Sequence, residues 1–82
     1  MISTVRDLVA DALFASFLQP SEAPAPEAVR AAMTHTLLRL GSDGCAAIVA
    51  QEFGDHPETA VRRMRWVRHV MESAYAGAAV TG

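Results

Sequence analysis

Residues 57–76, PETAVRRMRWVRHVMESAYA, carry the clearest structural pattern in the chain. Apolar side chains recur there every three or four residues, which is typical of an amphipathic helix. Asp55 and Glu58 have the spacing of a helix cap, and Pro57 suits the first turn because proline has no N–H to donate. The stretch therefore predicts a long helix whose inward stripe is Ala60, Met64, Val67, Met71 and Tyr75.

Upstream of this helix the same spacing predicts three more helices, and no hairpin signal lies between alternating runs. The segment QPSEAPAP at 19–26 carries three prolines, so we expect a stiff loop that serves only as a connection. Gly41 suits the residue just after a helix end. The sequence thus predicts a single all-α, four-helix domain over 1–82, with helices at about 4–18, 26–40, 44–53 and 57–76, a loop at 19–25 and a frayed tail at 77–82.

Composition excludes several classes of protein. The chain has 82 residues, a net charge of −2 and 51% hydrophobic residues, which is too apolar and too weakly charged for a disordered segment. Its one cysteine cannot form an internal disulfide, and no apolar run is long enough to span a membrane. Without a recognisable signal or anchor, we expect a cytoplasmic protein. All seven basic residues are arginine, which favours a bacterial source with GC-rich coding.

The predicted helix at 4–18 is apolar on two sides. Val5, Leu8 and Leu13 belong to one side, whereas Phe14 and Leu18 fall on the other. A helix with two apolar faces needs two partners. The second partner is either another helix of the same chain or a second copy, so Phe14 and Leu18 are the candidate interface of a homodimer.

The sequence offers little for catalysis or metal binding. It has no glycine-rich phosphate loop, and its glycines at 41, 44 and 54 fall at predicted helix ends. His35, Cys45, His56 and His69 lie far apart, whereas structural zinc sites pair ligands a few residues apart. We therefore expect a protein that is not an enzyme, with no catalytic residue, no metal and no cofactor.

Residues 61–71 differ in charge from the rest of the chain. They hold four arginines and no acidic residue, a charge of +4, against three arginines and nine acids, −6, in the other 71 residues. On a helix Arg62, Arg65 and His69 form one outward face, with Trp66 at its edge. Guanidinium groups on such a face suit phosphates or the guanine edge. The alternative is a solvated helix whose arginines pair with carboxylates of the same chain.

Residues 48–65, IVAQEFGDHPETAVRRMR, resemble the bacterial helix-turn-helix segment of DNA-binding regulators. Ala50 matches the small residue of its first helix and Gly54 the turn glycine, and the run Pro57, Glu58, Thr59 matches the entry to the recognition helix. Arg62 and Arg65 fall at positions that contact bases or phosphates in that family. Asp55 departs from the pattern, which usually has an apolar residue there.

The resemblance implies a small regulator of transcription that binds double-stranded DNA. Its last helix would enter the major groove, where Arg62 and Arg65 read bases or phosphates and His56 and Thr59 contact the backbone. A homodimer would present two such helices. The other hypothesis is a protein-interaction or adaptor module that binds a partner through Trp66 and the arginine face, because Trp and Arg are enriched in binding hot spots.

Overall fold

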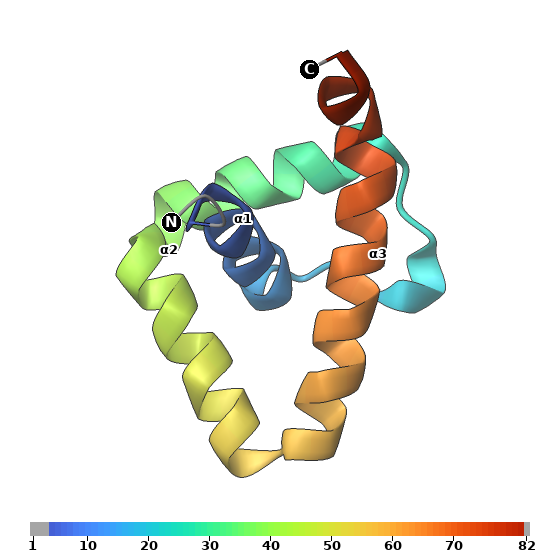
Figure 1. The fold of residues 1–82 in the computed structure, drawn as a ribbon. Coiled ribbons are helices and arrows are strands. Elements are labelled where there is room, and N and C mark those ends of the chain that lie inside the picture. Colours follow the sequence, from blue (N-terminus) through green and yellow to red (C-terminus); the bar gives the residue numbers. More distant parts are fainter. Residues whose placement is uncertain (1–3, 82) are drawn as a thin grey trace.

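The computed structural model describes the backbone of residues 4–81 and the side chains of residues 5–75. Its elements are α1 (Thr4–Ala15), the short 3-10 helix η1 (Pro20–Glu22), α2 (Pro26–Asp55) and α3 (Pro57–Thr81). Helix α1 lies between α2 and α3 and contacts both (Figure 1). The prediction of an all-α chain is confirmed, since residues 4–81 contain no strand. None of the helices described is long and apolar enough to cross a membrane.

Helix α2 replaces two of the predicted helices. The segments expected at 26–40 and 44–53 form one element, so the structure has three α-helices where four were predicted. Gly41 interrupts the helical backbone with φ 74° and ψ 167°, and α2 changes direction near its middle (Figure 1). Helical backbone resumes directly after this one residue, which leaves no room for a separate loop.

Helix α1 ends at Ala15, three residues before its predicted end at Leu18. The Ser16 hydroxyl donates to the Leu13 carbonyl oxygen at 2.6 Å and accepts from the Leu18 N–H at 3.3 Å. A serine side chain bonded in this way competes with the helical hydrogen bonds of the backbone. The main chain therefore leaves the helix at Ser16.

Two other predicted boundaries also differ. The loop at 19–25 contains η1, in which the Gln19 N–H donates to Glu22 Oε1 at 2.9 Å. Helix α3 continues to Thr81, although the sequence predicted its end at Ala76 and a frayed tail after it. Alanine, common in residues 76–79, is the best helix former, and it outweighs the single Gly77.

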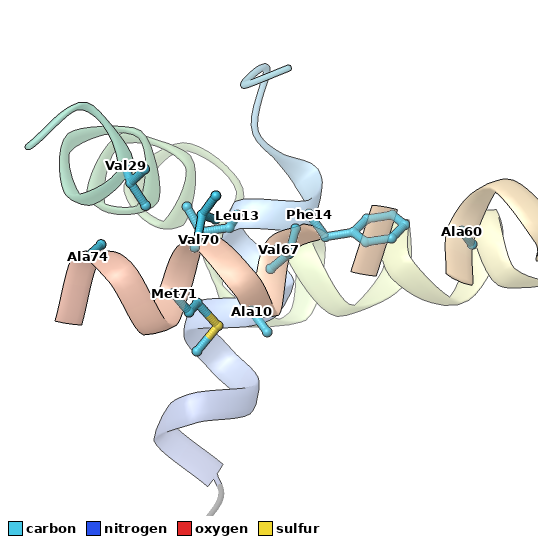
Figure 2. Close-up of a cluster of buried hydrophobic side chains, with 9 residues drawn as sticks. All are labelled: Ala10, Leu13, Phe14, Val29, Ala60, Val67, Val70, Met71 and Ala74. Atoms are coloured by element: carbon cyan, nitrogen blue, oxygen red, sulfur yellow. The ribbon is translucent and has the colours of Figure 1, made fainter. Parts of the chain in front are cut away.

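The core is formed where the three helices meet, and its largest fully buried apolar side chains include Leu13, Val29 and Val67 (Figure 2). The inward stripe predicted for α3 is confirmed, since its five members are buried or packed against this cluster. Phe14 is only 4% exposed and stacks on Phe53, with ring centroids 6.0 Å apart.

The burial of Phe14 corrects one predicted role. Its ring is covered by the same chain, so it does not offer the exposed surface that a dimer contact needs. Leu18, the other candidate, is half-buried and packs against the core. The second apolar side of α1 therefore has its partner within the chain, and the homodimer stays a prediction.

Thr36 supports a stability prediction, because its hydroxyl oxygen is fully buried and has no hydrogen-bond partner. Thr36→Val keeps the shape of the side chain and removes the unsatisfied hydroxyl, so we expect the free energy of unfolding to rise by about 1 kcal/mol. Urea denaturation followed by circular dichroism measures this. Thr34→Val, an exposed position on the same helix, is the matched control and should change little. A Thr36→Val variant less stable than the wild type would contradict the prediction.

Candidate functional site

A one-residue junction at His56 joins α2 to α3. The His56 N–H donates to the Glu52 carbonyl oxygen at 2.7 Å, and the His56 carbonyl oxygen accepts from the Ala60 N–H at 2.9 Å. One residue thus closes the last turn of α2 and takes part in the first turn of α3. Its side chain is exposed. This short junction starts α3 at Pro57, close to where the sequence predicted it.

The packing that the helix-turn-helix resemblance implies is not seen at this junction. In that family the small residue of the first helix allows the two helices to cross closely, yet Ala50 is exposed here. A Cβ added at Gly54 would meet no atom within 4 Å, so no helix approaches it closely either. The helix-turn-helix assignment is not confirmed by the fold.

Arg63 ties α3 to the carboxyl end of α1. Its Nε donates to the Phe14 carbonyl oxygen at 2.8 Å, and its Nη2 donates to the carbonyl oxygens of Ser16 at 2.9 Å and Leu13 at 3.4 Å. The guanidinium carbon lies 5.6 Å from the Phe14 ring centroid and 5.5 Å from that of Trp66. Burial lowers the pKa of this guanidinium, and the carbonyl groups at the negative end of the α1 dipole offset the cost of burying its charge.

A groove of about 670 Å³ is lined by Pro20 of η1 on one side and by residues of α3, Arg63 among them, on the other. Its α3 wall consists of residues one helical turn apart, which together make one face of the helix. Five of the six binding residues predicted from the sequence line this groove, and His56 does not. We call it the arginine groove, and its lining is Pro20, Thr59, Arg62, Arg63, Arg65, Trp66 and His69.

The lining of the arginine groove carries guanidinium groups but no carboxylate from the described residues. Arg62, Arg65 and His69 are exposed, and no acidic residue lines the groove. In the described side chains, the arginines that form hydrogen bonds are Arg30 and Arg63, and both bond to backbone carbonyls. No hydrogen bond joins Arg62 or Arg65 to a carboxylate among the described side chains, although Glu58, one turn earlier on α3, lines a neighbouring hollow together with Arg62. The alternative prediction, in which the arginines of this face pair with carboxylates of the same chain, therefore stays open for Arg62.

Arg68 belongs to a different side of α3. Burial and the neighbouring Asp7 raise the pKa of the Asp11 carboxyl, and the Arg68 guanidinium acts in the opposite direction. Arg68 thus lies near enough to Asp11 to affect its carboxyl group, and it does not belong to the lining of the arginine groove. Of the four arginines between residues 61 and 71, Arg63 bonds to α1 and Arg68 lies outside the groove lining, whereas Arg62 and Arg65 line the groove and form no hydrogen bond among the described side chains.

Trp66 is the aromatic residue in the lining of the arginine groove. It is half-buried and packs against the core. Pro20 of η1 lines the groove beside it, so the proline segment does more than connect two helices. Sequence reasoning missed Pro20 and the role of Arg63. Three prolines do indicate a stiff segment, but no local pattern says which helix it lies against.

The described side chains contain no group of three or more His, Cys, Asp or Glu placed to hold a metal ion. Cys45 is fully buried, and burial raises the pKa of its thiol, which disfavours the reactive thiolate. Comparison of the chain with protein-family models, with curated proteins and with solved structures gave no match. The function must therefore be argued from the groove itself.

Proposed function

We propose that this chain is a non-catalytic interaction module that binds an acidic peptide segment of a partner protein in the arginine groove. Arg62 and Arg65 donate hydrogen bonds to carboxylates of the ligand, and Trp66 provides the apolar contact between them. The observation that carries the proposal is that Arg62 and Arg65 are exposed and line one groove with Trp66, and that no acidic residue of the described part of the chain belongs to this lining. Guanidinium groups bind carboxylates through two parallel hydrogen bonds, and Trp and Arg dominate binding hot spots.

Duplex DNA is the second candidate ligand, and the protein would then be a small bacterial regulator. It is favoured by the exposure of Thr59, Arg62 and Arg65 on one helix directly after the tight junction at His56. Two observations favour the peptide instead. The close helix crossing at Ala50 is not formed, and Pro20 of η1 stands on the face that a duplex would have to approach.

The test is an NMR titration of the isotope-labelled chain with three probes. The first is a capped acidic peptide of Asp and Glu around a central Phe, the second is its neutral twin with Asn and Gln, and the third is a generic DNA duplex at low salt. We expect the acidic peptide to shift the Trp66 indole signal and to bind about tenfold more tightly than the neutral twin, which corresponds to about 1.4 kcal/mol.

Arg65→Ala and Arg62→Ala should each weaken binding of the acidic peptide about fivefold, as the loss of one exposed charge-assisted contact predicts. Arg39→Ala removes an exposed arginine on α2, remote from the groove, and should leave affinity unchanged. Equal affinity for the acidic and neutral peptides would overturn the proposal. Binding of the duplex alone, weakened by the same two substitutions and by salt, would replace it with the DNA candidate.

A further inference from the structure

A second hollow, of about 290 Å³, continues the arginine groove along α3. The two hollows share Pro20, Trp66 and His69 as a common wall. Along α3 the combined trough follows residues 59, 62, 66, 69 and 73, one helical face about 21 Å long at 1.5 Å per residue. We call the second hollow the proline hollow, because Pro20, Pro24 and Pro26 supply much of its lining.

The proline hollow differs from the arginine groove in charge, because no arginine belongs to its lining. Val29 of α2 and Val70 and Ala74 of α3 line it opposite the prolines, and neither an acidic residue nor an arginine belongs to the lining. Proline has no N–H to donate, so its ring offers a ligand an apolar surface and its backbone offers only the carbonyl oxygen. A site of this size and chemistry suits one large apolar side chain.

Backbone constraints shape both sides of the proline hollow. Each proline ring fixes its own φ, which stops the segment at 20–26 from collapsing onto α3. Ala23, between two of the prolines, holds the left-handed conformation with φ 46°. On the opposite side Arg30 Nη1 donates to the Ala74 carbonyl oxygen at 2.9 Å and holds α2 against α3.

We infer that the proline hollow seats one aromatic side chain of the same acidic peptide, and that the preferred ligand is an acidic segment with a single phenylalanine-like residue. This inference rests on the proposed function. A ligand whose carboxylates meet Arg62 and Arg65 passes directly over Trp66, and the next residues along α3 enter the proline hollow. An aromatic ring there contacts Trp66 and His69 from the side opposite the arginines. The contacts of the ligand carboxylates with Arg62 and Arg65 hold the peptide against this face of α3. The contact of its aromatic residue with the proline hollow fixes the register of the peptide along the helix.

The test compares two acidic peptides of equal charge, one with a central Phe and one with a central Ala, by calorimetry against the wild-type chain. We expect the Phe peptide to bind about tenfold more tightly, since an aromatic ring that leaves water in the hollow adds apolar burial that Ala cannot supply. Ser73→Phe, an exposed position that lines the hollow and not the arginine groove, should fill it and remove the difference. Ala47→Phe, exposed on α2 and remote from both hollows, is the control and should preserve it.

The outcomes separate this inference from the proposed function. Equal affinity of the two peptides for the wild-type chain, with the Arg65→Ala effect retained, would overturn the aromatic seat and leave the acidic-peptide proposal standing. A preference for Phe that Ser73→Phe does not reduce would place the aromatic residue elsewhere and also overturn the inference. If neither peptide binds, the proposed function fails, and the inference fails with it. Circular dichroism of each variant checks that the fold is kept.

Discussion

Arg63→Ala should lower the free energy of unfolding by about 3 kcal/mol, because it removes two short charge-assisted hydrogen bonds and one long one from the carboxyl end of α1. For a domain of this size such a loss lowers the midpoint of thermal unfolding by about 15 °C. The substitution also leaves the carbonyl groups of Leu13, Phe14 and Ser16 without this donor. Urea and thermal denaturation followed by circular dichroism measure both quantities.

Two further variants show whether the loss is specific to Arg63. Arg65→Ala removes an arginine only two residues away whose side chain is exposed, and its stability should change by no more than about 0.5 kcal/mol. Arg63→Lys keeps the positive charge without the planar fork, so a stability between those of Arg63→Ala and the wild type is expected. If Arg63→Ala unfolded at the same urea concentration as Arg65→Ala, the link between α3 and α1 would contribute little.

Arg63 also shows why sequence periodicity predicts only part of this fold. The spacing on α3 predicted that Val67 and Met71 are buried, and the structure agrees. The partners of Arg63 are nonetheless carbonyl groups 47 to 50 residues earlier in the chain. Every residue has a backbone carbonyl, so the sequence does not mark which carbonyls accept from Arg63. Hydrogen bonds from a side chain of one helix to the end of another helix therefore cannot be predicted from local patterns.

The candidate site likewise has one part that the sequence predicts and one part that only the tertiary structure shows. Thr59, Arg62, Trp66 and His69 share one helical face by spacing alone, and the structure places them in one groove. Pro20 completes that groove from a segment nearly forty residues away, and only the tertiary packing brings it there. For Phe14 the sequence left two partners open, another helix of the same chain or a second copy of the chain. An apolar helix face predicts that the face is buried in a contact, but it does not identify the partner in that contact.

Gly41→Ala should lower the free energy of unfolding by about 2 kcal/mol, because φ 74° with ψ 167° is a backbone region that essentially only glycine adopts. No atom lies within 4 Å of the Cβ that alanine would add, so the expected loss comes from the backbone and not from a clash. The change in direction of α2 depends on this conformation. Urea denaturation measures the loss.

Two replacements separate backbone strain from a general effect of losing glycine. Gly54→Ala lies in the regular part of α2 with open space around its Cβ position, and a better helix former there should raise stability by about 0.5 kcal/mol. D-alanine at position 41, introduced by chemical synthesis, adds the same methyl group but favours positive φ, and should restore most of the stability that Gly41→Ala loses. If D-alanine proved as destabilising as L-alanine, the positive φ of Gly41 would not be the cause, and α2 would owe its change of direction to its contacts with α1 and α3.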